Sequence, residues 1–172
     1  EAPATVPENE IVTVQKEGTA TFIFRRGGTT IATLPITPAM EAIQLLRQVG
    51  TMAYFKTTQT GGGGYVLFNS ASVVVVQVNS ANGVITMLKH DGRRLEDISP
   101  NGQFMAWSEY LDNGDKNIIV ENLKTQTEQS FPVEKKYSQF GDAHFSPDST
   151  KLAYAAAVGF PGKENGTAYV IT

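Results

Sequence analysis

The sequence lacks several residue types on which common protein classes depend. Cysteine is absent from the 172 residues, which excludes a disulfide framework, a thiol nucleophile and a cysteine-based zinc site. Only 18% of the residues are charged, the formal net charge is −3, and lysine and arginine are scattered along the chain. Because nucleic-acid binding requires clustered basic residues, no nucleic-acid partner is expected.

Long hydrophobic runs are also missing. No apolar stretch reaches the roughly 18 residues that a membrane-spanning helix needs, so no transmembrane segment is expected. Residues 1–10 contain two prolines and few apolar side chains, which is typical of a linker. Such a linker can follow a signal peptide or a lipid anchor, or it can simply be a boundary of the sequence. The first reading predicts an extracytoplasmic protein, either periplasmic or a lipoprotein.

One short phrase occurs twice at a fixed spacing. Residues 97–107 contain Ser-Pro-Asn-Gly followed by Phe-Met-Ala-Trp, and residues 144–154 contain Ser-Pro-Asp-Ser followed by Lys-Leu-Ala-Tyr, 47 residues later. Proline and Asn or Asp at these positions favour a tight turn, and apolar residues flank the turn on both sides. With the strands expected after each copy, the unit is about four short antiparallel strands in roughly 45 residues, the size of a propeller blade.

The two copies resemble the repeat of TolB-like and WD40-like β-propellers. The resemblance rests on Ile-Ser-Pro-Asn-Gly, Met-Ala-Trp and Glu-Asn-Leu-Lys-Thr in the first copy, and on Phe-Ser-Pro-Asp and Leu-Ala-Tyr in the second. It covers residues 97–172. Ser149 departs from the usual turn glycine, and Asn122 from the usual aspartate. The resemblance implies an antiparallel propeller, a fold used in envelope proteins and as the non-catalytic half of prolyl-oligopeptidase-like enzymes.

The predicted fold class is therefore all-β, with about three to four propeller-like blades, some of them incomplete. After the linker at 1–10, one propeller-like domain is expected over 11–172. Its predicted parts are a partial blade at 11–34, a degenerate blade at 51–88, a blade at 97–133 and an incomplete blade at 143–172.

One short helix is expected near residues 38–49, between the first two blades. Thr37 is a good N-cap, Pro38 suits the first helical position, and the apolar residues that follow fall near one helical face. Gly50 is expected to end this helix.

Three polar residues are candidates for a site in the central channel of the propeller. His144 occupies the repeat position of Asp97, and Asp142 lies two residues before it. By the resemblance, inner strands line the channel, so Asp97, Asp142 and His144 can converge there on a divalent ion or a small ligand. The favoured alternative is that they only hydrate a wet channel. No catalytic, cofactor-binding or metal-binding residue is assigned, and no cofactor is expected.

Other motifs indicate turns rather than chemistry. The sequence contains no Gly-x-Ser-x-Gly, so hydrolase chemistry of that class is not encoded in it. Arg25 and Arg26 can contact an anion, but solvated charges at a hairpin are favoured. The four glycines at 61–64 lack the Lys-Ser/Thr of a phosphate loop. Residues 112–115 have a calcium-like composition but read better as a turn.

The sequence predicts a non-enzymatic scaffold that binds a protein or cell-envelope component through loops 57–64, 110–116 and 157–166. One alternative is the propeller portion of a prolyl-oligopeptidase-like hydrolase whose catalytic domain lies outside this chain. Another is the metal or small-ligand site in the channel. Open sheet edges would also allow a homodimer.

Overall fold

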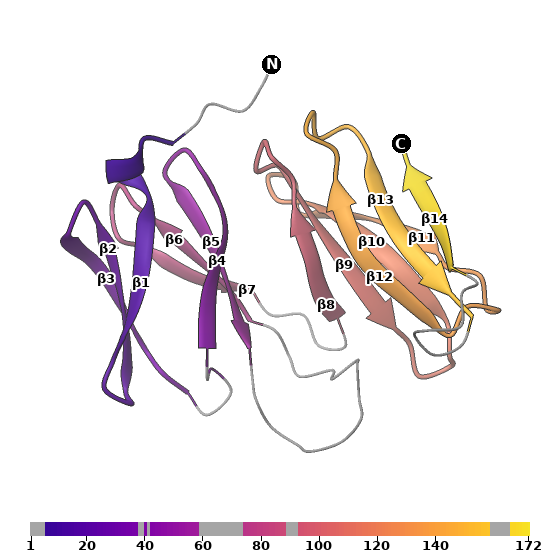
Figure 1. Ribbon diagram of the computed structural model, residues 1–172, viewed down its shortest axis with the longest axis horizontal. Coiled ribbons are helices and arrows are strands. Elements are labelled where there is room, and N and C mark those ends of the chain that lie inside the picture. The colour runs from indigo at the N-terminus through magenta and orange to yellow at the C-terminus, as the bar shows by residue number, and fades with distance from the viewer. Residues whose placement is uncertain (1–5, 38–39, 41, 59–73, 89–92, 159–165) are drawn as a thin grey trace. The chain divides into compact units, whose positions relative to one another are not determined.

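A computed structural model describes residues 6–37, 40, 42–58, 74–88, 93–158 and 166–172. The described chain consists of strands β1 to β14 and one short 3₁₀ turn, η1 (Glu8–Glu10), and the strands form four antiparallel sheets (Figure 1). The predicted all-β class is thus confirmed. The chain divides into two compact units, residues 4–91 and residues 92–172, which are described separately below.

The first unit contains two sheets. Sheet A has the strand order β1-β2-β3, and sheet B has the order β4-β5-β6-β7, so each sheet is a simple meander of sequential hairpins. Their strands are β1 (Val12–Glu17), β2 (Thr21–Arg26), β3 (Thr29–Pro35), β4 (Ala42–Val49), β5 (Met52–Thr58), β6 (Val75–Asn79) and β7 (Ile85–Leu88).

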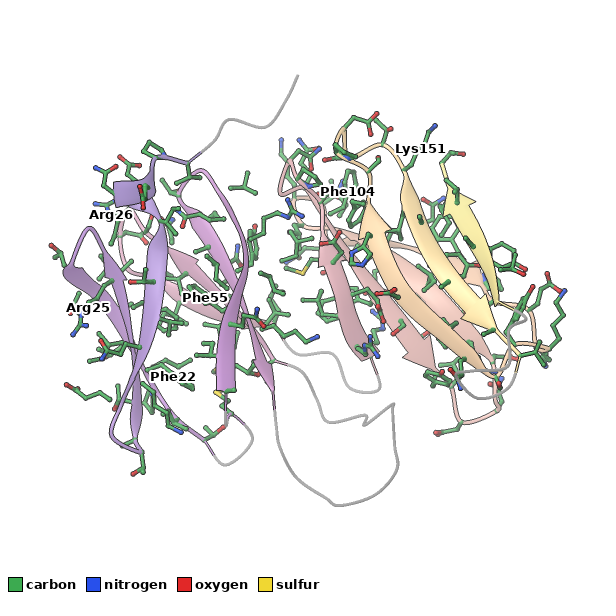
Figure 2. The ribbon with its side chains drawn as sticks, viewed as in Figure 1. Phe22, Arg25, Arg26, Phe55, Phe104 and Lys151 are labelled. Carbon is green, nitrogen blue, oxygen red and sulfur yellow. The ribbon has the colours of Figure 1, made fainter. Side chains whose placement is uncertain are left out.

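An apolar core joins sheets A and B. Phe24 of sheet A meets Phe55 of sheet B edge to face, with ring centroids 5.0 Å apart, and Phe22 is buried in the same cluster (Figure 2). Val74, Val75 and Val76 are all buried, as expected for the most β-prone run of the sequence. Successive side chains of a strand point to opposite faces, so β6 is buried on both faces of sheet B.

A glutamine side chain links the first strands of the two sheets. The Gln48 side-chain oxygen accepts a hydrogen bond from the backbone N–H of buried Val12 at 2.8 Å. The Gln48 amide nitrogen donates to the carbonyl oxygens of Glu10 and Gly50 at 2.9 and 3.1 Å. One side chain on β4 therefore satisfies a buried backbone donor of β1.

The predicted helix near 38–49 is wrong, because residues 42–49 form strand β4. Ile43 and Leu45 both pack against the core of the first unit, which is the two-residue period of a strand. Gly50, expected as a helix end, has φ of 55° and sits in the two-residue turn between β4 and β5. Pairing along the whole of β5 outweighs the weak helical preference of the sequence.

The second unit also contains two sheets. Sheet C has the order β11-β10-β9-β8, and sheet D has the order β12-β13-β14. Their facing sides share an apolar core that includes Ala106 and Ile118 of sheet C and Phe140, Leu152 and Tyr154 of sheet D. The strands are β8 (Arg93–Ile98), β9 (Phe104–Tyr110), β10 (Lys116–Asn122), β11 (Thr127–Pro132), β12 (Gln139–Phe145), β13 (Leu152–Ala157) and β14 (Gly166–Ile171).

The repeated phrase forms the same turn twice in this unit. In the first copy the Ser99 hydroxyl accepts from the Phe104 N–H at 2.9 Å and donates to Asn101 at 2.7 Å. In the second copy the Ser146 hydroxyl accepts from the Lys151 N–H at 3.0 Å and donates to Asp148 at 2.6 Å. Each serine side chain therefore caps the turn that it opens.

Sheets A and D have three strands each among the described residues, whereas sheets B and C have four.

Candidate functional site

A bulge on the first strand of sheet C directs a carboxylate toward sheet D. The pairing of β8 with β9 shifts between Leu95 and Asp97, so Glu96 is the extra residue. Its side chain, only 2% exposed, accepts from the Ser108 hydroxyl at 2.6 Å and from the Ala143 N–H of β12 at 3.3 Å. Bulges commonly re-aim a side chain in this way, and here the result is a buried link between two sheets.

Gly141 of β12 lies directly against this carboxylate. Its φ is +134°, and a Cβ placed on it would stand 3.0 Å from a Glu96 side-chain oxygen. A side chain at position 141 would therefore be strained and would also press on a pinned carboxylate. The sequence reading missed Glu96 and Gly141, because neither lies in the repeated phrase.

The structure brings the predicted cluster of Asp97, Asp142 and His144 together. The His144 Nδ1 atom is 3.8 Å from an Asp97 oxygen, and its Nε2 atom is 3.3 Å from an Asp142 oxygen. The side chains of His144 and Asp142 are 67% and 83% exposed, while that of Asp97 is 17% exposed. Both Asp97 oxygens already accept backbone hydrogen bonds at 2.8 Å, from the N–H groups of Ile98 and Phe145.

Asp97 therefore acts first as a second link from sheet C to sheet D. Within the residues that the structure describes, no group of three His, Asp or Glu side chains has an arrangement that could hold a metal ion. The geometry gives no support to the divalent-ion reading, and a ligand-binding role for the cluster stays a prediction.

The outer face of sheet D, which points away from sheet C, is exposed and carries small apolar side chains beside His144. Across this face His144 pairs with Ala153 and Ala153 with Val170, and in the next row Ala155 pairs with Ala168. All five side chains are exposed, Val170 to 62%.

The same rows in sheet C are covered. In sheet C the corresponding row is Asp97, Ala106 and Val120, and Ala106 lies 47 residues before Ala153. Ala106 is fully buried, and Val120 packs against the core shared with sheet D. The row His144, Ala153 and Val170 on the outer face of sheet D is therefore equivalent to the row of sheet C that packs against sheet D.

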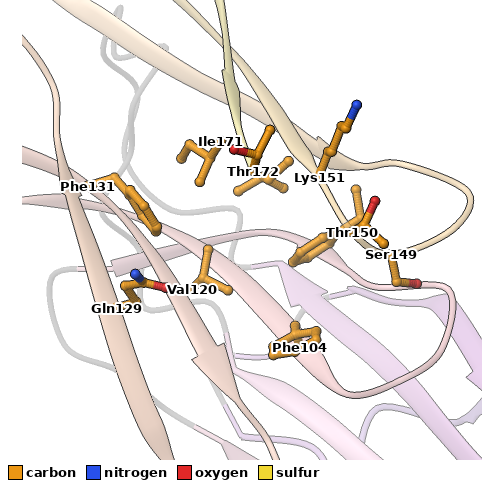
Figure 3. A pocket seen from close by; sticks show the side chains of 11 residues that line it. Phe104, Val120, Gln129, Phe131, Ser149, Thr150, Lys151, Ile171 and Thr172 are labelled. Carbon is orange, nitrogen blue, oxygen red and sulfur yellow. The ribbon is translucent and has the colours of Figure 1, made fainter.

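A pocket of about 160 Å³ opens between sheets C and D, beside the second repeated turn (Figure 3). Phe104, Val120 and Phe131 of sheet C and Leu152 and Ile171 of sheet D contribute its apolar walls. The pocket reaches the outermost strand of each sheet, because Phe131 belongs to β11 and Ile171 to β14.

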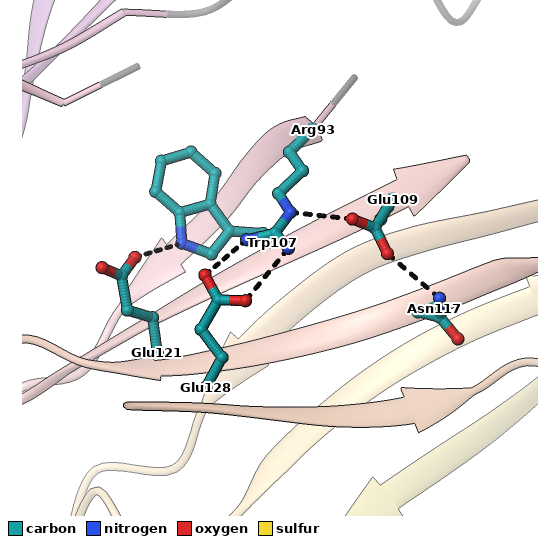
Figure 4. Close-up of polar contacts among 6 residues, drawn as sticks. All are labelled: Arg93, Trp107, Glu109, Asn117, Glu121 and Glu128. Carbon is teal, nitrogen blue, oxygen red and sulfur yellow. Dashed lines mark hydrogen bonds and ion pairs between the residues drawn. The ribbon is translucent and has the colours of Figure 1, made fainter. Parts of the chain in front are cut away.

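The charged groups of sheet C mostly satisfy one another. The Arg93 guanidinium donates to both oxygens of Glu128 at 2.6 and 3.0 Å and to Glu109 at 2.9 Å (Figure 4). These hydrogen bonds, led by the one to Glu128, raise the pKa of Arg93 above its usual value. The Trp107 indole N–H donates to Glu121 at 3.0 Å, as buried indoles usually require a partner. This network stabilises sheet C by linking strands β8, β9, β10 and β11 through side-chain hydrogen bonds.

The remaining predicted motifs fall in turns or outside the described residues. Asn113 accepts from the Asp115 N–H at 2.9 Å within a tight hairpin, as predicted for residues 112–115. Arg25 donates to Gln15 of the neighbouring strand at 2.6 Å. Loops 59–64 and 159–165, and with them the glycine run, lie outside the described residues. Among the described residues, no helix has the length and apolar character needed to cross a membrane.

Comparisons with known proteins identify the fold and no more. A scan against protein-family models gave no match, and a search of curated proteins gave none either. The β-propeller domain of the Trilobed protease from Pyrococcus furiosus, described as having an open velcro topology, superposes with a TM-score of 0.52 at 17% identity. The chain has the fold of β-propeller blades. The predicted resemblance to TolB-like propellers is thus confirmed at the level of the fold.

Two further solved structures are similar to the chain at lower TM-scores. They are an acylaminoacyl peptidase in complex with Z-Gly-Gly-Phe-chloromethyl ketone (0.49, 15% identity, 69% of this chain) and a protein provisionally named TolB from Agrobacterium tumefaciens (0.47, 14% identity, 88% of this chain). The Trilobed protease match covers 76% of this chain. The blades span 38% of that protease domain, 18% of the peptidase and 57% of the Agrobacterium protein.

Proposed function

We propose that this chain is a non-catalytic, extracytoplasmic propeller-like scaffold that binds a protein partner on the outer face of sheet D. The observation that carries the proposal is the repeat of a sheet-binding face. Val120 packs against the shared core of the second unit, and Val170, in the same row of sheet D, is 62% exposed. A valine that is packed in one sheet and exposed at the equivalent position of the next sheet indicates a surface that can bind another apolar surface.

The polar residue of the row supports the same proposal. Asp97 accepts a hydrogen bond from the backbone of the next sheet, at Phe145. His144 stands at the equivalent position of sheet D, and its imidazole can both donate and accept a hydrogen bond. We therefore expect the partner to present backbone groups of a β-sheet to His144 and apolar side chains to Ala153 and Val170.

The proposal is tested by purifying tagged protein from its native host in three forms. These are the unaltered chain, Ala155→Arg on the outer face of sheet D, and Thr13→Arg on sheet A as a matched control, since both replaced side chains are exposed. A partner should be retained by the unaltered chain and the control and lost from Ala155→Arg. Equal retention by both arginine variants would contradict the proposed surface.

A second candidate is that the chain is the propeller part of a peptidase whose catalytic domain lies elsewhere in a longer protein. It is favoured by the protease name of the propeller domain that superposes with a TM-score of 0.52. A fluorophosphonate probe applied to the protein from its native host decides between the candidates. Labelling of a species much heavier than 18.6 kDa that contains these blades would favour the peptidase.

The extracytoplasmic location is tested by cell fractionation. We expect the protein in the periplasmic or membrane-anchored fraction of the host. Recovery of the protein only with cytoplasmic markers would contradict the extracytoplasmic location. That result would not bear on the binding face of sheet D.

A further inference from the structure

Three oxygen-bearing side chains meet where the segment between β11 and β12 contacts sheet D. Glu134 and Tyr137 belong to this segment, and Tyr169 lies on β14. The hydroxyl oxygens of Tyr137 and Tyr169 are 2.5 Å apart, and the Tyr169 hydroxyl is 3.2 Å from the Oε1 atom of Glu134. Two phenols and one carboxylate therefore bring three oxygen atoms to one point of the second unit.

Aromatic packing fixes the positions of both phenols. The ring of Tyr169 stacks on that of Tyr154, with centroids 5.2 Å apart and an interplanar angle of 16°, and it meets Tyr137 edge to face at 5.8 Å. Tyr137 and Tyr154 are buried in the core that sheets C and D share. Rings that are locked by packing hold their hydroxyls in place before a ligand arrives, as a preorganised site requires.

A lysine holds the carboxylate so that one of its oxygens stays directed toward the phenols. The Lys136 ammonium pairs with the Oε2 atom of Glu134 at 2.8 Å, whereas Oε1 is the atom that accepts from Tyr169. Carboxylates that bind metals are commonly held by such outer partners. The Glu134 side chain is 57% exposed, so a solute can reach the three oxygens from this side.

The spacing of these oxygens fits a small, hard cation. An ion that binds oxygens octahedrally at about 2.0–2.1 Å holds adjacent ligand oxygens about 3 Å apart. The two separations in the cluster, 2.5 and 3.2 Å, lie on either side of that value. Carboxylate and phenol oxygens are also the donors that hard cations prefer.

The chemistry of the phenols favours a trivalent cation over a divalent one. A phenol has a pKa of about 10, so only a strongly polarising cation displaces its proton at neutral pH. Hydrogen bonds with Thr167 and Tyr169 lower the pKa of Tyr137, which eases the loss of the first proton. Two phenolates and the Glu134 carboxylate then carry three negative charges, which balance a trivalent cation.

We propose that Tyr137, Tyr169 and Glu134 bind one ferric ion through two phenolate oxygens and one carboxylate oxygen. Binding releases the two phenol protons to water and leaves the oxidation state of the iron unchanged. Successive side chains of a strand point to opposite faces, so Tyr169 lies on the face of β14 opposite to that of Val170. The site is therefore separate from the outer face of sheet D and does not depend on the proposed function.

The proposal is tested by titrating the full chain with ferric citrate and recording visible absorption. Iron(III) bound to phenolate has a charge-transfer band at longer wavelengths than ferric citrate itself, and we expect this band to saturate at one iron per chain. Loss of an outer partner alone weakens metal binding by about 10–100-fold, so Tyr137→Phe and Tyr169→Phe should each weaken it by at least about tenfold. Tyr110→Phe, which removes a phenol beside Phe140 on β9, is the matched control and should change it less than about twofold.

A carboxylate variant keeps the test decisive where a tyrosine variant fails to fold. Glu134→Gln changes an exposed side chain and should weaken binding by about tenfold while the charge-transfer band remains, because both phenolates are still present. Absence of the band from the unaltered chain, or an equal band in the Tyr137, Tyr169 and Tyr110 variants, would overturn the proposal. Iron binding without a phenolate band would indicate an adventitious ion only, and would overturn it as well.

Discussion

The contact between Gly141 and Glu96 makes a sharp prediction for the link between sheets C and D. Replacing Gly141 by alanine should destabilise the second unit through two separate effects. The residue has φ of +134°, a conformation that side-chain-bearing residues rarely adopt. The added Cβ would also stand 3.0 Å from a Glu96 oxygen that hydrogen bonds to Ser108 and Ala143 hold in place.

The two effects can be given rough magnitudes. Backbone strain of this kind costs about 1–3 kcal/mol. A weakened hydrogen bond to a buried carboxylate costs about 1.5–3 kcal/mol, and Glu96 is only 2% exposed. We therefore expect Gly141→Ala to lower the free energy of unfolding of the second unit by about 3–5 kcal/mol. Trp107 is the single tryptophan of the chain and lies in this unit, so its fluorescence in urea reports the transition directly.

Two comparisons separate the strain from the clash. Gly114 has φ of +84° with open space at its Cβ position, so Gly114→Ala should cost only about 1–2 kcal/mol. When Glu96 is already replaced by alanine, Gly141→Ala should lower the free energy of unfolding only by the backbone strain. The coupling energy between the two substitutions should therefore be about 2 kcal/mol. Equal costs for the two glycine variants, or no coupling, would refute the proposed role of Glu96.

Three further predictions concern single side chains. Gln48→Ala should destabilise the first unit by about 1–3 kcal/mol, measured by circular dichroism in urea, because it leaves the buried Val12 N–H without its acceptor. The hydrogen bonds that Asp148 accepts lower its pKa to about 2, so its stabilising effect is complete above the unfolded value near 4 and is lost as the pH falls toward 2. Asp148→Asn should remove this acid sensitivity, and an unchanged pH dependence would contradict it. Ser149 has φ of 62° where Gly102 stands in the first repeat, so Ser149→Gly should be about 1 kcal/mol more stable than Ser149→Ala.

The repeated turn shows why part of this fold can be predicted from sequence. Ser99 and Ser146 act through local hydrogen bonds within five residues, and such chemistry is visible in the sequence itself. The 47-residue spacing then predicts the blades, since each copy must build the same unit. Trp107 and Tyr154, the aromatic residues that end the two copies of the phrase, are both buried.

The errors and omissions arise where distant contacts decide the structure. The residue types at 42–49 are compatible with a helix or a strand. Two contacts with distant parts of the chain select the strand: the pairing of β4 with β5 and the hydrogen bond between Gln48 and Val12 of β1. Glu96 became a link between sheets through a bulge, and bulges leave little trace in a single sequence. The exposed row that ends at Val170 was missed because exposure depends on what packs above a strand. Aligning Val170 with Val120 in the sequence could have indicated this exposed row.

The central claim is that the outer face of sheet D binds a protein, and site-specific photocrosslinking in the native host tests it most directly. A benzoylphenylalanine residue is placed at Val170 or Ala155 on this face and, as a control, at exposed Thr13 on sheet A. The account predicts a discrete protein adduct from positions 170 and 155 and none from position 13. Absence of adducts at 170 and 155, with the variants folded and present in the host at normal levels, would contradict it.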